Sequence, residues 1–512
     1  MRKWLVMALL LAVVIGSQYM GWRQRSDVSV TQEQVAGTPV RTYAPAGASR
    51  GVVIVAHGFA GNKELMGPWG YYLARQGFTT YVVDQPGHGA SARPLPKWQG
   101  TEQTPLGDNL RALIDQLVTG GRAEAGRIAL VGHSMGGTTV TQAALADARV
   151  RATVTLSSAY RQTLPADRPA NLFSIAAEND PTFMVQAVKD LAAQAGGGTG
   201  ELGVYYGDYK AGTARASDVI AGRNHITILY DTHVMRQTAL WIGYSFGDKP
   251  EPAAVAFGWS WTLVALAGAM LVVVTLGTIL APREGRWTSS GPPARVGLVT
   301  AIVTVAVAAF SAVLACVYLR IPWPRVAVLD YLLPYFLVMT VVLLVLRLFW
   351  PREFGFPLGN SQGSAVLSFL RGGVLFLGFL GAAGPIIHMN VSNFLPTSVR
   401  VAAMVPVAVV FWLYFVQEEG LKRAVASGIS GWAGALVGVI GKGVVVLTWF
   451  GAAALPNPQS FLPLIAPVML GVLLGLEFFS YLFARWRYPA TATATFAALL
   501  LAWVALVTFP LV

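Results

Sequence analysis

The sequence contains one cysteine, Cys316, and only 12% of its 512 residues are charged. A single cysteine excludes a disulfide within the chain and a metal site built from several cysteines. Soluble domains usually carry about 25% charged residues, so the low charge and the hydrophobic fraction of 54% indicate a membrane protein. The net charge of +12 comes without a basic helix with interleaved aromatic residues, and we therefore expect no nucleic-acid partner.

Charge is distributed unevenly along the chain. Residues 251–512 hold only 14 of the 37 Lys and Arg residues and 7 of the 25 Asp and Glu residues. Apolar stretches of about 20 residues, the length that crosses a bilayer, recur in this part. Because consecutive stretches lack a polar face, core helices of a soluble protein are excluded. We predict eight transmembrane helices, at 256–280, 296–319, 326–348, 366–388, 401–416, 431–453, 461–483 and 490–511.

The first 26 residues have a basic tip and an apolar core, "MRKWLVMALLLAVVIGSQYMGW". Such a segment is either a cleaved signal peptide or an anchor, and bulky residues after Gly16 leave no good cleavage site. We therefore predict an uncleaved transmembrane anchor at 1–26. The predicted organisation continues with a domain at 27–250 and a membrane domain of about eight helices at 251–512.

Loop charge predicts the orientation in the membrane. If the amino terminus is cytoplasmic, eleven Lys and Arg residues lie on the inner side, against five in short outer segments. The inner set includes Arg283, Arg286, Arg295 and Arg352. Because positive residues favour the cytoplasmic side, we expect a multi-pass protein of the cell membrane with residues 27–250 outside the cytoplasm.

Residues 27–250 alternate apolar runs with helical patterns. The runs "GVVIVA", "TTYVV", "RIALVGHS", "RATVTLSS" and "NLFSIAAE" read as strands, and the segments between the first four as helices. Continuous apolar strands separated by helices predict an α/β fold, a mostly parallel sheet covered by helices on both faces. Ligands of such sheets bind at the carboxyl ends of the strands.

The segment "GRIALVGHSMGG" places Ser134 between a predicted strand and a predicted helix. A tight strand–turn–helix crowds the backbone, and Gly132 and Gly136 would relieve that crowding and leave the serine hydroxyl exposed. The pentapeptide "GHSMG" by itself fits a helix cap at a glycine-rich turn as well as it fits a nucleophile. A serine nucleophile also needs a base, so the rest of the chain must supply one.

His225 is the best candidate for that base. Of the six histidines, only His225 and His233 follow Ser134 outside the apolar segments, and His225 lies in a loop before the last helix of the domain. His233 lies within that helix, where we expect it to pack or be solvated. The acid should follow a strand that comes after Ser134, and Asp180 in "AENDPT" does so. Weaker candidates for the acid are Glu178, Asp208 and Asp218.

Two backbone N–H groups should bind the oxyanion that forms at the attacked carbonyl. One is predicted to be the amide of Met135, directly after the nucleophile, and the other the amide of Phe59 in "VAHGFAGNK". Gly58 would let this loop come close to the substrate, and His57 would support it.

The motifs "HGFAGNK", "VVDQPGHGAS", "GHSMGG", "AENDPT" and "NHITI" resemble, in this order, the conserved loops of α/β-hydrolases. The resemblance covers about residues 40–245 and is nearest to the dienelactone-hydrolase and small-esterase branch. It implies a Ser-His-Asp triad and no metal or organic cofactor. Only about a dozen residues separate the strands "RATVTLSS" and "NLFSI", so the helical cap of many related lipases is absent from this position.

The sequence therefore predicts a membrane-embedded serine hydrolase that cleaves an ester or acyl bond, with a lipid or other amphiphilic ester as substrate and membrane lipids as partners. Two alternatives stay open: an acyltransferase using the same triad, and a transporter or channel with a hydrolase-like regulatory domain. Protein partners and oligomeric state are not predicted.

The sequence does not assign a role to the charged residues within the predicted spans. Arg371 and Glu477 lie at equal predicted depth and could form an ion pair, and Lys442 lies near mid-span. Glu418 and Glu419 are predicted to be solvated at the inner membrane boundary.

Overall fold

The computed structural model describes residues 1–96, 105–160, 162–249, 259–282, 296–318, 321, 323–351, 365–428, 430–452 and 462–512. The chain divides into two compact units. The helical unit consists of Met1–Ile15, Ala265–Pro385 and Ser398–Val507. The sheet unit consists of Gly16–Val264, Ile386–Thr397 and Thr508–Val512. The domain boundaries expected at residues 26 and 250 stay predictions.

The sheet unit is built on a sheet that, in the described residues, has nine strands in the order β1-β2-β4-β3-β5-β6-β7-β9-β8. The strands β4, β3, β5, β6, β7 and β9 are parallel, and β1, β2 and β8 pair antiparallel at the two edges. The bounds are β1 Ser29–Val35, β2 Thr38–Ala44, β3 Val52–Ala56, β4 Thr79–Val83, β5 Ile128–His133, β6 Val150–Leu156, β7 Leu172–Ala177, β8 Tyr205–Tyr206 and β9 Arg215–Ile220.

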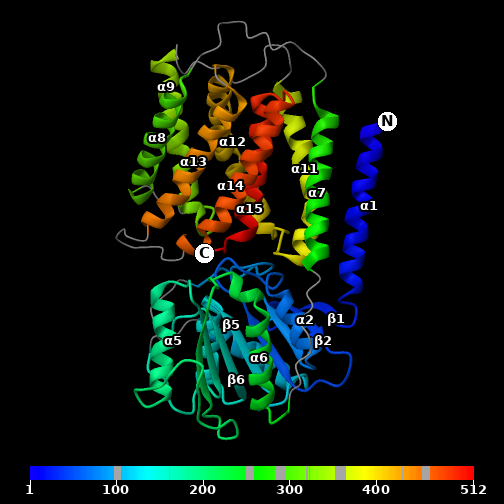
Figure 1. Ribbon diagram of the computed structural model, residues 1–512, viewed down its shortest axis with the longest axis vertical. Helices are drawn as coiled ribbons and strands as arrows, with labels where there is room; N and C mark the ends of the chain where they lie inside the picture. Colours follow the sequence, from blue (N-terminus) through cyan, green and yellow to red (C-terminus); the bar gives the residue numbers. More distant parts are fainter. Residues whose placement is uncertain are drawn as a thin grey trace. The chain divides into compact units, whose positions relative to one another are not determined.

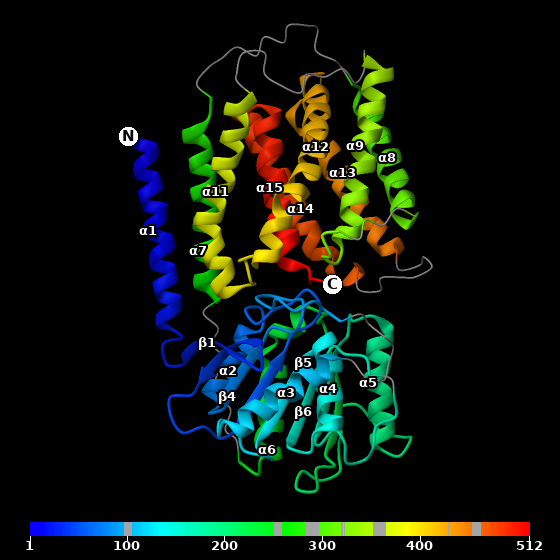
Figure 2. The same ribbon diagram turned by 180° about the vertical axis from the view of Figure 1, so that it is seen from behind.

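Helices cover both faces of this sheet. Figure 1 shows α6 (Thr232–Ser245) in front of β5 and β6, and Figure 2, from behind, shows α3 (Pro105–Thr119) and α4 (Met135–Ala146) in front of the same strands. One apolar cluster lies on each face of the sheet. On one face Val53 and Val55 pack with α6 and α2 (Gly67–Arg75), and on the other Val52 and Ile54 pack with α3 and α4. Successive strand residues point to opposite faces, so a fully apolar β3 is buried on both sides.

The predicted α/β architecture is confirmed, and the five apolar runs form β3 to β7. The edge strands β1, β2 and β8 and the strand β9 were not predicted. The sequence of β9, "RASDVI", is too polar to read as a buried strand, and β1, "SVTQEQV", is largely exposed. The helix α5 (Thr182–Ala195), which packs beside β7 and β9, was also not predicted.

Two short stretches from later in the chain complete the sheet unit. The side chain of Asn62 donates to Ser392 Oγ (2.8 Å) and accepts from the backbone N–H of Asn393 (3.1 Å). Leu511 donates its backbone N–H to the carbonyl of Gly87 (2.9 Å) and accepts from the N–H of Leu95 (2.7 Å). The loop after β4 is thus hydrogen-bonded to residues more than 400 positions further along the chain.

Seven helices in the described part of the chain are long and apolar enough to cross a membrane. They are α1 (Arg2–Arg23), α7 (Trp259–Leu280), α9 (Leu329–Phe349), α11 (Ala365–Asn390), α12 (Ser398–Gly428), α14 (Leu462–Arg485) and α15 (Ala490–Thr508). Two further apolar helices are α8 (Leu298–Tyr318) and α13 (Gly431–Ala452). In both views α7 and α11 lie side by side, and Leu276 of α7 contacts α11 at Gly378.

Each predicted span coincides with one of these helices, but α12 is much longer than the expected 401–416. Arg283, Arg286, Arg295 and Arg352, on which the predicted orientation partly depends, lie outside the described residues. The orientation therefore stays a prediction.

The prediction for Glu418 and Glu419 is wrong. Because α12 continues to Gly428, both lie inside the helix, and each is only 3% exposed. Glu418 Oε1 accepts from Lys442 Nζ (2.8 Å), and Glu419 Oε1 accepts from Lys422 Nζ (2.6 Å).

Glu477 is also paired, but with lysines rather than with Arg371. Its Oε2 accepts from Lys442 Nζ (2.8 Å) and from Lys422 Nζ (3.0 Å). The result is an alternating chain of buried carboxylates and ammonium groups that joins α12, α13 and α14. Removing one member of such a chain would leave a buried charge uncompensated, so the five groups depend on one another.

Candidate active site

Ser134 lies at the sharp turn between β5 and α4, in a conformation with φ 54° and ψ −119° that non-glycine residues rarely adopt. The neighbouring glycines permit this turn. A Cβ on Gly132 would lie 2.2 Å from the carbonyl oxygen of Gly136, and a Cβ on Gly136 would lie 2.3 Å from that of Ala56. The glycines therefore serve the close packing of strand, turn and helix that the sequence analysis expected.

The structure brings Ser134, His225 and Asp180 together in one hydrogen-bonded chain. His225 Nε2 lies 3.0 Å from Ser134 Oγ, and His225 Nδ1 lies 2.7 Å from Asp180 Oδ1. His225 and Asp180 are 7% exposed, whereas Ser134 is half-buried. With Nδ1–H donated to the carboxylate, Nε2 is left as the acceptor for the serine proton, which is the arrangement a general base requires.

Further hydrogen bonds hold Asp180 as a carboxylate. Its Oδ2 accepts from Ser157 Oγ (2.5 Å) and from the backbone N–H of Ala177 (2.8 Å). Burial by itself would raise the pKa of Asp180, but the hydrogen bond and charge of His225 and the bonds from Ser157 and Ala177 outweigh it and lower the pKa. The group is thus ionised at neutral pH.

The weaker acid candidates are engaged elsewhere. Glu178 Oε2 accepts from the backbone of Gly222, Asp208 Oδ1 from Ala211, and Asp218 Oδ1 from Val219. His233 is exposed in the first turn of α6.

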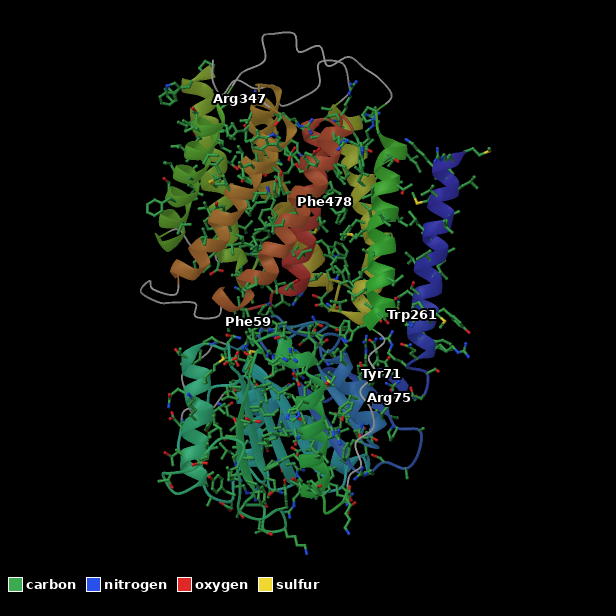
Figure 3. All side chains as sticks on the ribbon, in the orientation of Figure 1. Phe59, Tyr71, Arg75, Trp261, Arg347 and Phe478 are labelled. Atoms are coloured by element: carbon green, nitrogen blue, oxygen red, sulfur yellow. The ribbon has the colours of Figure 1, made fainter. Side chains whose placement is uncertain are left out.

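The loop after β3 lies directly against the serine. A Cβ on Gly58 would lie 2.9 Å from the Ser134 Cβ, so only glycine allows this approach. Phe59, labelled in Figure 3, follows in this loop, and Met135 begins α4, where helix N–H groups have no intrahelical acceptor. The role of the Phe59 and Met135 amides as oxyanion donors stays a prediction.

His57 fixes the shape of that loop. Its Nε2 accepts the backbone N–H of Gln85 (3.1 Å), so Nδ1 carries the proton and donates to the carbonyl of Gly58 (2.7 Å). The Gln85 side chain donates back to the His57 carbonyl and accepts from Thr139 Oγ1 (2.9 Å). Burial lowers the pKa of His57, which keeps the ring neutral in this role.

Three further residues, which were not predicted, support this site: Ser157, Gln85 and His133. His133 is buried beside Ser134, and its Nε2 lies 2.8 Å from the carbonyl oxygen of His225. Burial, followed by the nearby His225, lowers the pKa of His133 to about 3, so its neutral ring donates Nε2–H and holds the His225 backbone. The position of His133 directly before Ser134 in "GHSMG" was the one feature of the sequence that could have identified it as a site residue.

Within the described ranges, no three His, Cys, Asp or Glu side chains gather in a way that could hold a metal ion. The sequence-based expectation that no metal or cofactor is needed stays a prediction.

Comparison with known proteins supports a hydrolase. Residues 47–194 match the Hydrolase_4 family model, described as serine aminopeptidase, S33. No curated protein matches the chain significantly. The match and the sheet agree on an α/β-hydrolase fold in the amino-terminal part and indicate an enzyme of the serine hydrolase class. Because the family description names a peptidase, the dienelactone-hydrolase branch stays a prediction.

Solved structures similar to the chain share little sequence with it. TT1662 from Thermus thermophilus is 17% identical, with 43% of this chain and 99% of that chain covered and a TM-score of 0.32. A puromycin-hydrolyzing peptidase of Mycobacterium tuberculosis is 15% identical, with coverage of 44% and 40% and a TM-score of 0.34. An esterase/lipase from an uncultured bacterium is 13% identical, with coverage of 43% and 84% and a TM-score of 0.30.

The depressed pKa of His133 predicts that the sheet unit loses stability in mild acid. An unfolded histidine binds a proton below about pH 6.5, whereas folded His133 does so only below about pH 3. The free energy of unfolding should therefore fall as the pH drops through 6.5, by about 2 kcal/mol for this residue between pH 8 and pH 5.

Thermal unfolding of the full chain in detergent at several pH values would measure this loss. His133→Gln keeps an N–H donor but cannot titrate, so its unfolding temperature should depend less on pH. The exposed His233→Gln serves as the control and should behave like wild type. An equally steep pH dependence in His133→Gln would contradict the prediction.

Proposed function

We propose that the protein is a serine hydrolase that cleaves an ester or acyl bond with Ser134, His225 and Asp180 as its catalytic triad. The observation that carries the proposal is the chain of hydrogen bonds from Asp180 through His225 to Ser134, at 2.7 and 3.0 Å, on a strained turn. A helix cap would need neither the buried carboxylate nor the correctly oriented imidazole.

The proposed reaction has two stages. Ser134 Oγ attacks the carbonyl carbon while His225 Nε2 takes the hydroxyl proton, and Asp180 stabilises the imidazolium that forms. The amides of Met135 and Phe59 bind the negative oxygen of the tetrahedral intermediate. His225 then gives the proton to the leaving group, which departs and leaves an acyl-enzyme. A water molecule, activated in turn by His225, hydrolyses the acyl-enzyme and regenerates Ser134.

Two alternative functions are compatible with the presence of Ser134, His225 and Asp180. An acyltransferase would pass the acyl group to an alcohol in place of water. A transporter with a hydrolase-like regulatory domain would not need the geometry of Ser134, His225 and Asp180, and that geometry favours an enzyme. The peptidase description of the matching family also supports testing amides beside esters.

Covalent labelling with a fluorophosphonate tests the nucleophile. The wild-type chain should be labelled, and Ser134→Ala should not, because the attacking oxygen is removed. His225→Ala and Asp180→Asn should lower the labelling rate on the order of a thousandfold or more, the histidine variant most. His233→Ala is the matched control and should label at the wild-type rate. Labelling of Ser134→Ala at the wild-type rate would refute the assignment.

We further propose that the substrate is a lipid or another amphiphilic ester. Support comes from the apolar helices in the same chain and from the short segment between β6 and β7, which leaves no room for a large cap. Moving an alkyl chain from an apolar phase into water costs about 0.8 kcal/mol per methylene, on the order of 10 kcal/mol for 16 carbons. An enzyme anchored in the membrane avoids much of that cost.

A chain-length series tests this substrate class. The full chain in nanodiscs should cleave long-chain lipid esters with a higher kcat/KM than short soluble esters or peptide amides. Ser134→Ala should abolish every activity and serves as the control. An added alcohol that accepts the acyl group in preference to water would identify an acyltransferase. A preference for soluble esters or amides would refute the lipid proposal.

We also propose that the hydrolase part, residues 27–250, lies outside the cytoplasm of the cell. The loop-charge count supports this orientation. After replacement of Cys316 by serine, a cysteine introduced at the exposed Asp208 should react with a membrane-impermeant maleimide in intact cells. A cysteine at Arg2 is the opposite-side control. Reaction at position 208 only after lysis would mean that residues 27–250 lie in the cytoplasm, opposite to the proposal.

A further inference from the structure

Asn62 is a buried residue of the loop between β3 and α2, three positions after Phe59, and only 1% of it is exposed. Its Oδ1 accepts from the backbone N–H groups of Leu65 (3.0 Å) and Asn393 (3.1 Å), and its Nδ2 donates to Ser392 Oγ (2.8 Å). Burying an amide is costly unless hydrogen bonds replace its contacts with water, so these three bonds fix the position of Asn62. Two of the partners lie 330 and 331 positions further along the chain.

Those two partners belong to residues 391–397, which connect α11 with α12 and are part of the sheet unit. This connection has hydrogen bonds of its own. The Ser392 N–H donates to the carbonyl of Ile387 (2.9 Å), and Asn393 Nδ2 donates to that of Leu395 (2.9 Å). A segment between two candidate spans is thus ordered locally and offers fixed partners to Asn62.

The turn that Asn62 follows carries the predicted oxyanion donor. A backbone hydrogen bond of 3.0 Å closes this turn, Gly58–Gly61, and the Ala60 φ of 58° lies in a region that non-glycine residues rarely adopt. Strained conformations persist only where surrounding contacts hold them. At the start of the turn the His57 ring donates to the first carbonyl, and directly after its end Asn62 is bonded to the α11–α12 connection. The Phe59 amide lies between these two attachments.

We propose that Asn62 is a positioning residue for the hydrolase reaction, held in place by Ser392 and Asn393 of the α11–α12 connection. The inference rests on the proposed function, because the loop binds an oxyanion only if Ser134 attacks a carbonyl. A donor such as the Phe59 amide must lie about 3 Å from the oxygen that becomes negative, and the bond matters most in the transition state. Asn62 therefore contributes to kcat rather than to KM.

Hydrolysis of p-nitrophenyl butyrate by the full chain in detergent tests the inference, with kcat expressed per active site titrated to completion with a fluorophosphonate. Ser392→Ala removes the acceptor of the Asn62 amide and should lower kcat about tenfold with KM nearly unchanged, less than the loss of about 100-fold or more when an oxyanion donor is deleted. Ser392→Thr keeps a hydroxyl and should restore most of the loss. Ser398→Ala, exposed at the start of α12, is the matched control and should keep the wild-type kcat.

Two further measurements separate positioning from a merely structural role. The affinity for a trifluoromethyl ketone, which forms an oxyanion on the attacking serine, should fall in Ser392→Ala by the same factor as kcat. The double variant of Asn62→Ala and Ser392→Ala should lose no more kcat than Asn62→Ala alone, because both changes break the same bond.

The outcomes distinguish this inference from the function on which it rests. A wild-type chain that neither takes up the fluorophosphonate nor hydrolyses the ester would refute the proposed function and the inference with it. An active wild type whose kcat is matched by Ser392→Ala and by Asn62→Ala would overturn the inference alone. A fall of kcat in Ser392→Ala without a fall in ketone affinity, or an equal fall in Ser398→Ala, would also overturn it.

Discussion

The candidate site depends on how closely three backbone segments approach one another around Ser134. Gly58, Gly132 and Gly136 each occupy a place where a Cβ would come within 3 Å of a neighbouring atom. With a larger residue at these positions, the loop after β3 could not lie beside the serine, and the strained turn at Ser134 would lose the neighbouring segments that support it. The hydrogen bonds of His57, His133 and Asp180 then fix groups that the close packing has already brought near.

The sequence predicted the parts of this site that follow from chain order. Ser134, Asp180 and His225 each follow a strand or precede a helix in a fixed succession, and apolar runs locate those strands. Ser157 and Gln85 could not be predicted in the same way, because their contacts with Asp180 and His57 arise from the spacing of neighbouring strands. That spacing is a property of the folded sheet and leaves no local pattern in the sequence.

For the long apolar helices, too, the position of each helix could be predicted from the sequence, but the partners of its charged side chains could not. Hydropathy located each helix, because an apolar run is a local signal. The expected solvation of Glu418 and Glu419 was wrong, and the lysine partners of Glu477 were not foreseen, since depth along a helix says nothing about rotation or about the neighbouring helix. Lys422 and Lys442 reach these carboxylates from α12 and α13, and only packing brings them together.

The pairing of Leu511 with Gly87 and Leu95 affects the order of events during synthesis. The loop after β4 leaves the ribosome more than 400 residues before its hydrogen-bond partner does. Domains generally fold as units while synthesis proceeds, yet this one exposes a backbone N–H and a carbonyl until α15 has been made. The loop that carries Gln85, and through it His57, therefore acquires this support only after Leu511 has been synthesised.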